Sequence, residues 1–302
     1  MKDFHDEGIT LVALVVTIIA ILVLAGITLN LALGDQGLLG RAQTASNTMA
    51  EATRNEMAMM DEYVETIYDE TTNEYITEGL ILHLDGINNT RNGHSTTTTT
   101  WEDLSGNNND FTKLSSASNA IWSDNSFVGD ETNRTLVLNK AILENATEAT
   151  VEVCYDVPNL KDHYWVFQNR QVDQPPNGFQ FWINSKSRRI RLWKNNSIYN
   201  SLTNAKGSNT TYLEKMTMAF AVDSNKVTFS ENANFYYEDT IEGVIPSIME
   251  RNYYSISNRY PWQSPGLCLK GNIYSIRVYN RKLSEEELTK NFYVDKERFN
   301  MN

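Results

Sequence analysis

The sequence predicts a mostly β protein, an antiparallel two-sheet sandwich preceded by a long amino-terminal helical region. Residues 9–33 form 25 consecutive positions without a charged side chain. Residues 38–67 carry apolar side chains at helical spacing, and from Gly79 onward the apolar period changes from about 3.6 to about 2. The chain therefore divides into a leader (1–8), a transmembrane helix (9–33), an amphipathic stalk helix with a linker (34–75) and a sandwich domain (76–302).

The apolar run begins at Ile9 and ends at Leu33, with the sequence ITLVALVVTIIAILVLAGITLNLAL. At ~1.5 Å per residue such a helix is about 37 Å long, which is enough to cross a hydrocarbon core of ~30 Å. A helix of a soluble domain is rarely apolar on every face. We expect a single-pass membrane helix. The alternative is a cleaved secretory signal, which has a shorter apolar run and a more basic start than Lys2 alone provides.

The residues around Gly8 resemble the class III signal of type IV prepilins. Gly8 follows a short polar leader and precedes Ile9-Thr10-Leu11-Val12 and the apolar run. The resemblance implies that a prepilin peptidase cuts between Gly8 and Ile9 and methylates the new amino terminus, and that the bulk of the chain lies outside the cell. In that family a glutamate usually occupies the fifth mature position and neutralises a neighbour's terminal ammonium. Here that position is Ala13, so assembly into a surface filament stays open.

The stalk is predicted from apolar residues that fall on one helical face. Their spacings are three, four or eight residues, and they are Leu38, Ala42, Ala45, Met49, Met57, Met60, Val64 and Ile67. The opposite face carries charged residues such as Glu51 and Arg54. Such a stripe packs on the following domain or on a pilin-like partner helix through residues 38–67.

The net charge of −12 is concentrated in the stalk, because residues 34–75 contain nine acidic and two basic side chains. Binding to nucleic acid requires a basic surface, so nucleic acid is not an expected partner. The Lys and Arg distribution around the apolar run sets only a weak orientation bias. The prepilin-like leader is the main reason to expect a cell-membrane protein with its carboxyl-terminal domain outside.

The sandwich is predicted from short stretches with alternating apolar residues. They are Leu80–Asp85, Thr150–Tyr155, Gly178–Asn184, Arg189–Trp193, Met216–Val222, Lys226–Ser230 and Gly271–Tyr279. Asp223 to Lys226 has the composition of a hairpin turn. Many short strands without intervening amphipathic helices are typical of an antiparallel sandwich.

Three blocks of this region resemble laminin-G-like, concanavalin A-like jelly rolls: GLILHLD at 79–85, WEDLSGNNND at 101–110 and GNIYSIRVYNRKLSEEEL at 271–288. The resemblance implies a jelly roll of two curved antiparallel sheets, and a function in binding or adhesion, often to glycans. Ser284 and Glu287 also form a capping box, which predicts a closing helix that begins at Glu285.

We expect a non-enzymatic adhesion protein. A minority of this fold family are glycoside hydrolases, which makes a membrane-tethered hydrolase the second interpretation, and a minor pilin or secretion pseudopilin the third. Retaining glycosidases need two carboxylates ~5 to 5.5 Å apart, and the pattern Glu-x-Asp-x-x-Glu is absent. The nearest acidic group, at 238–242, has the wrong register because adjacent strand residues face opposite sides.

Strand alternation predicts a ligand-binding face on two neighbouring stretches. In 179–184, alternation places the apolar Phe179, Phe181 and Ile183 on one side of the strand. In 189–193, it places the apolar Ile190 and Leu192 on one side in the same way. The polar side then carries Gln180, Trp182, Asn184, Arg189, Arg191 and Trp193. Sugar rings stack on indole and hydrogen-bond to amide and guanidinium groups, so we expect a carbohydrate site here. The alternative is that loops such as Tyr260-Pro261-Trp262 cover both tryptophans.

A non-enzymatic adhesion protein requires no cofactor, and the one candidate ligand for a calcium ion is Asp103. The turn 103–110 has oxygen-bearing side chains at alternate positions, and relatives with this fold sometimes hold calcium. Asx-turn hydrogen bonding within the loop is the simpler interpretation. Cys154 and Cys268 lie 114 positions apart in strand-like stretches. A domain of this size needs no disulfide, so we expect two unpaired thiols, and one bridge between neighbouring strands is the alternative.

Overall fold

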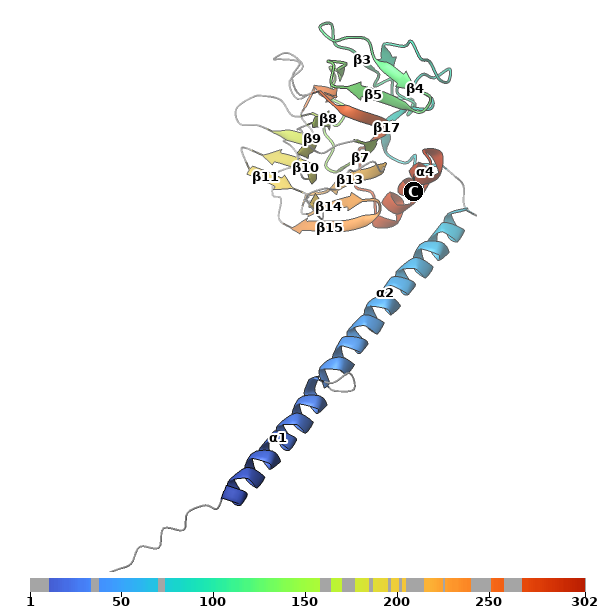
Figure 1. Cartoon of the computed structure of the whole chain (residues 1–302). Coiled ribbons are helices and arrows are strands. Elements are labelled where there is room, and N and C mark those ends of the chain that lie inside the picture. The colour runs from blue at the N-terminus through green and yellow to red at the C-terminus, as the bar shows by residue number, and fades with distance from the viewer. Residues whose placement is uncertain are drawn as a thin grey trace, which may run out of the picture. The chain divides into compact units, whose positions relative to one another are not determined.

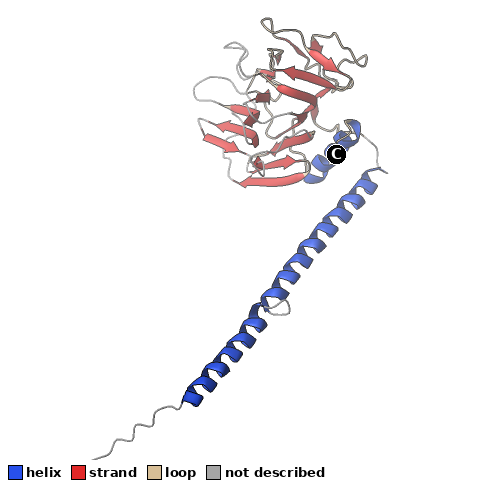
Figure 2. Ribbon diagram, viewed as in Figure 1, coloured by secondary structure: helices blue, strands red, loops and turns tan. Residues whose placement is uncertain are grey.

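A computed structural model describes residues 11–33, 38–69, 74–157, 164–169, 177–184, 187–194, 197–200, 203–204, 215–224, 226–239, 251–257 and 268–301. The chain divides into two compact units, Met1–Thr71 and Thr72–Asn302. The first unit is helical and the second is rich in strands (Figures 1 and 2).

The first unit contains two long helices, α1 (Leu11–Leu33) and α2 (Leu38–Asp69). Side chains of α1 are described from Leu14 to Thr28, and every large apolar one among them is exposed. Over the described residues, no helix is long and apolar enough to cross a membrane. In α2 the described side chains are exposed as well, with Met49 73% accessible.

The second unit contains two antiparallel sheets, as the alternation predicts. The first runs in the order β15-β14-β13-β7-β17-β5-β4, and β1 also pairs with β17. Its described strands are β15 (Asn234–Asp239), β14 (Lys226–Glu231), β13 (Met216–Val222), β7 (Ala149–Asp156), β17 (Lys270–Tyr279), β5 (Ser126–Asp130), β4 (Ile121–Ser123) and β1 (Leu80–Asp85).

The second sheet runs in the order β11-β10-β9-β8-β16-β6-β3-β2, and β12 also pairs with β10. Its described strands are β11 (Ser197–Asn200), β10 (Ser187–Lys194), β9 (Gly178–Asn184), β8 (Tyr164–Gln168), β16 (Tyr254–Ile256), β6 (Leu136–Leu138), β3 (Phe111–Lys113), β2 (Thr100–Trp101) and β12 (Thr203–Asn204). Strand order in both sheets departs from chain order, so the chain crosses repeatedly between the two layers.

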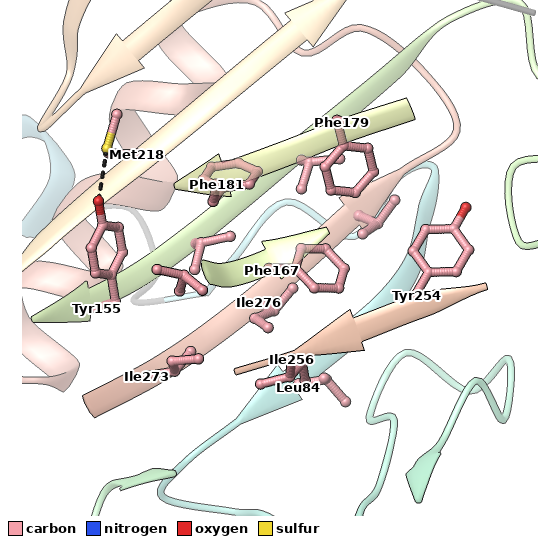
Figure 3. Packing of buried hydrophobic residues seen from close by; sticks show 14 of the residues in the cluster. Leu84, Tyr155, Phe167, Phe179, Phe181, Met218, Tyr254, Ile256, Ile273 and Ile276 are labelled. Atoms are coloured by element: carbon pink, nitrogen blue, oxygen red, sulfur yellow. Dashed lines mark hydrogen bonds between the residues drawn. The ribbon is translucent and has the colours of Figure 1, made fainter. Parts of the chain in front are cut away.

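The core lies between the sheets and is rich in aromatic side chains (Figure 3). Phe179 and Phe181 of β9 pack against Phe220 of β13, with ring centroids 5.3 and 6.0 Å apart. The Tyr155 hydroxyl donates to Met218 Sδ at 3.0 Å, so this buried phenol keeps a hydrogen-bond partner (Figure 3). The phenylalanine contacts hold the two layers together, whereas the Tyr155–Met218 bond joins the neighbouring strands β7 and β13 of the first sheet.

The helix α4 (Glu285–Arg298) packs on the face of the first sheet that points away from this core. Leu288 is buried with Ala219 and Ala221 of β13 and with Tyr279 of β17. The Ser284 side chain accepts from the Glu287 N–H, and the Glu287 carboxylate accepts from the Ser284 N–H. The predicted capping box and the predicted start of this helix at Glu285 are therefore confirmed.

Candidate ligand-binding face

The predicted site residues lie on the hairpin formed by β9 and β10, two adjacent strands at one end of the second sheet (Figure 1). Their register places Arg189 opposite Trp182, Arg191 opposite Gln180 and Trp193 opposite Gly178. Directly opposed residues of an antiparallel pair share a face, so these side chains lie on one side of the sheet. Asn184 is opposite Ser187, and the structure describes neither of their side chains.

Phe179, Phe181, Ile190 and Leu192 alternate with the site residues and are buried in the core. The apolar sides of β9 and β10 therefore fix the orientation of the hairpin, because a shift by one residue would move four core side chains to the opposite face. The alternation predicted this shared face correctly.

A row of side-chain amides crosses the sheet beneath this face. Trp193 Nε1 donates to Gln180 Oε1 at 3.1 Å, and Gln180 Nε2 donates to Gln168 Oε1 at 2.9 Å. Gln168 Nε2 in turn donates to Ser255 Oγ at 3.2 Å. Gln180, Gln168 and Ser255 are buried, so the row forms a base that orients the Trp193 indole. Sequence reasoning missed Gln168 and Ser255 because neither β8 nor β16 was predicted as a strand.

Trp182 lies deeper than Trp193. It is 7% exposed, and the Arg191 guanidinium carbon lies 3.8 Å from the centre of its ring system. Arg189 approaches the same ring at 5.6 Å, and Trp165 of β8 lies 6.1 Å away. Arg191 therefore occupies the position over the indole that a sugar ring would need. Trp182 is thus a buried support for the two arginines, and the open stacking surface expected of it is not present.

The partly exposed side chains of this face are Trp193, Arg189 and Arg191. They combine an indole ring with two guanidinium groups, each of which carries several N–H donors in a fixed plane. Such a surface can hold hydroxyl or carboxylate oxygens while a ring packs on the indole.

Asp103 forms the hydrogen bonds of a tight turn. Its Oδ1 accepts from the backbone N–H groups of His83 and Ser105 at 2.8 and 2.9 Å. Its Oδ2 accepts from the Ser105 hydroxyl and the Asn109 N–H, both at 2.9 Å. Four donors thus surround the carboxylate, which is the arrangement of the Asx-turn interpretation and leaves no side open for calcium. Within the described residues, no three acidic, histidine or cysteine side chains gather in a way that would hold a metal ion.

Cys154 and Cys268 are both buried, and no disulfide joins them. Burial raises the pKa of the Cys154 thiol, so it stays protonated.

Three further predicted features fall partly or wholly outside the described residues, and one of them is the loop 260–262, the alternative cover for the tryptophans. Gly8 and Ile9 also lie wholly outside the described residues. In the acidic group 238–242, Glu238 and Asp239 are the last residues of β15, and the other three positions are not described.

No protein family model matches the sequence, and no curated protein does either. Among solved structures, the chain is similar to binding domains of botulinum neurotoxins. One is the serotype C1 binding domain (TM-score 0.56, 13% identity). Another is a botulinum neurotoxin type C structure from work on cell entry, which is described as dependent upon interaction with two ganglioside molecules (TM-score 0.55, 14% identity). A third is the botulinum neurotoxin DC binding domain in complex with rat synaptotagmin II (TM-score 0.54, 16% identity).

Each of these matches covers 72% of this chain and about half of the other chain, 51 to 52%. This chain therefore spans about half the length of the structures it resembles. At such low identity the similarity shows the fold, a β sandwich of the kind found in these binding domains.

Proposed function

We propose that this chain is a non-enzymatic, membrane-anchored surface protein whose sandwich domain binds a glycan through the β9–β10 face. The observation that carries the proposal is the partly exposed group formed by Trp193, Arg189 and Arg191 above the buried amide row. Protein sites for sugars combine an aromatic ring with a few fixed polar groups, and this face supplies both.

The fold supports a binding role. The botulinum neurotoxin domains with a similar fold include structures that concern ganglioside molecules, SialylT and synaptotagmin II. The β1 strand, the 101–110 turn and the β17–α4 region carry the laminin-G-like blocks, so we assign the sandwich to the jelly-roll type. That assignment adds adhesion to glycans as the expected role.

The segment Ile9–Leu33 is the proposed membrane anchor. It contains no charged residue, and α1 occupies 23 of its positions. Its described apolar side chains, from Leu14 to Ile27, are exposed around the helix. Soluble proteins rarely expose a continuous apolar surface of this extent, whereas a bilayer would cover it. The sandwich domain is then presented outside the cell on α2.

The leader is proposed to be removed between Gly8 and Ile9 by a prepilin-type peptidase. Mass spectrometry of the mature chain from its native membrane tests this step. The expected amino terminus is Ile9, carrying one added methyl group. An intact Met1 would contradict the processing, and a terminus near Gly34 would contradict both the processing and the retained anchor.

The binding proposal is tested with the full-length chain in detergent micelles on a glycan array, together with an assay for sugar release from the polysaccharides that bind. We expect retention on a subset of glycans without release of product. Release of product would favour a glycoside hydrolase instead. Absence of binding, combined with co-purification of the chain in surface filaments, would favour the minor-pilin alternative.

A further inference from the structure

A cleft lies in the sandwich unit, and none of its lining residues belongs to the β9–β10 hairpin. Its volume is about 740 Å³, within the range of small-ligand sites. Its walls come from the segment Glu74–Thr77, from β1 and the loop after it, and from the last turn of α4. The elements at the two ends of the sandwich sequence therefore meet at this cleft.

His83 of β1 lines the cleft and has an unusual environment. Its buried Nε2 makes no hydrogen bond to the described residues, and the nearest carboxylate oxygen, Asp85 Oδ2, is 3.9 Å away. The ring of Tyr75 lies edge-on at 5.1 Å. Burial, helped by the positive charge of Arg277, lowers the pKa of His83 to about 4. The imidazole is therefore neutral at physiological pH, with one N–H donor and one acceptor nitrogen.

Arg298 supplies hydrogen-bond donors to the same cleft. Its Nε donates to Asp85 Oδ2 at 2.6 Å, which fixes the guanidinium plane. Asp85 Oδ1 accepts from the N–H groups of Ile87 and Asn88, so the carboxylate is itself held by the loop. Neither Nη of Arg298 donates a hydrogen bond to any described residue. A ligand in the cleft would find two fixed donors there.

The charges around the cleft limit the ligand that it can accept. Glu74 and Glu297 lie on exposed parts of the lining and would repel an anion. Asp85 also lines the cleft, but its charge is paired with Arg298, and the neutral His83 offers no charge to attract an anion. Apolar side chains such as Leu104 and Val294 complete the wall. Uncharged ligands with many hydroxyl groups and exposed C–H faces satisfy all of these groups.

We propose that this cleft is a second ligand site that binds a neutral saccharide unit. His83 and Arg298 hydrogen-bond to its hydroxyl groups, and the glutamates at the rim accept from others. The inference shares with the proposed function only the class of ligand, because the cleft and the β9–β10 face have no residue in common.

The test titrates the full-length chain in detergent micelles with N-acetylglucosamine, galactose and cellobiose, followed by the ¹⁵N signals of His83. One of these sugars should shift the His83 signals at millimolar concentration. His83→Phe keeps a ring at this position and should weaken binding by about tenfold or more, as two lost hydrogen bonds would. The matched control is His94→Phe, because His94 is exposed and does not line the cleft.

A charged analogue tests the selection by charge. Glucuronate should bind more weakly than the neutral sugars, because Glu74 and Glu297 repel its carboxylate. Equal binding by the wild type and His83→Phe, tighter binding of glucuronate than of the neutral sugars, or no shift with any neutral sugar would overturn the proposal. Trp193→Ala should leave cleft binding unchanged, so loss of the hairpin site and loss of the cleft site are separate results.

Discussion

At the scale of single residues, Arg277 shows how charge is stabilised inside this sandwich. It is 0% exposed, with Nε 2.9 Å from Glu152 Oε2 and Nη2 2.7 Å from Asp295 Oδ2. Asn291 Nδ2 also donates to Glu152 Oε2, at 2.7 Å. Burial raises the pKa of Glu152, and Arg277 opposes that shift. The partners come from β7, β17 and α4, so no local sequence pattern could have revealed the cluster.

Removing Arg277 should therefore destabilise the fold strongly. Arg277→Met leaves two buried carboxylates without a counter-charge, and we expect a loss of about 3 to 5 kcal/mol in the free energy of unfolding. Arg281→Met is the control, since the Arg281–Glu287 pair is partly exposed and should contribute only about 1 kcal/mol or less. Urea unfolding followed by tryptophan fluorescence measures both. Equal losses in the two variants would contradict the role given to the buried cluster.

His83 should make stability depend on pH. Its pKa is about 4 in the folded state and 6.5 for the ordinary side chain. Between these values the unfolded chain binds a proton that the folded chain does not, so the free energy of unfolding falls as the pH drops from 6.5 to about 4. The slope approaches about 1.4 kcal/mol per pH unit.

The charged groups around the ring act in both directions on this pKa. Arg277 and Arg298 lower it, whereas Asp85 and Asp295 raise it. Unfolding measured across this pH range should show a smaller decline in His83→Phe than in the wild type, because that variant has no imidazole to titrate. Parallel curves for the two proteins would show that His83 has an ordinary pKa in the folded state.

At the scale of elements, the agreement between sequence and structure depends on strand length and on alternation. Long alternating stretches were predicted well: β1, β9 and β13 have the expected bounds. Strands of two or three residues, such as β2 and β16, are too short to show a period and were missed. The longer strands β5, β8 and β15 were missed because their apolar residues do not alternate regularly. Alternation also predicted the face on which Trp182 lies, but it did not predict that the side chain is buried. The burial depends on Arg191 and on Trp165 of the neighbouring strand β8, which cover the indole.

The closing helix offers a test at this scale. Ser284→Ala removes the side chain that accepts from the Glu287 N–H, and we expect a loss of about 1 kcal/mol in the free energy of unfolding. Thr289→Ala is the control, because Thr289 lies in the same helix and its hydroxyl bonds only to the Glu285 carbonyl one turn earlier. Urea unfolding should show little change for the control. A Ser284→Ala variant as stable as the wild type would mean that packing of Leu288 alone fixes the start of α4.

At the scale of the whole molecule, composition and period predicted the division into a helical part and a strand-rich part. The boundary between the two compact units, at Thr71 and Thr72, lies within residues 34–75, the predicted stalk helix and linker. The cleft at His83 could not be predicted, because it joins the segment after the stalk to the last turn of α4, more than 200 residues later. Only folding brings these two ends of the sandwich sequence together.

The central claim is that the sandwich binds a glycan through Trp193. The most direct measurement compares the affinities of the wild type, Trp193→Ala and Tyr236→Ala for the best glycan found on the array. Tyr236 is the matched control, an aromatic side chain 49% exposed on β15 of the other sheet.

Loss of one stacked indole should cost about 1 to 2 kcal/mol, so Trp193→Ala should bind roughly tenfold more weakly with an unchanged melting temperature. Tyr236→Ala should bind as the wild type does. Wild-type affinity in Trp193→Ala would contradict the claim. A collapse of its melting temperature, with the ~3 to 5 kcal/mol loss typical of a core tryptophan, would contradict it equally.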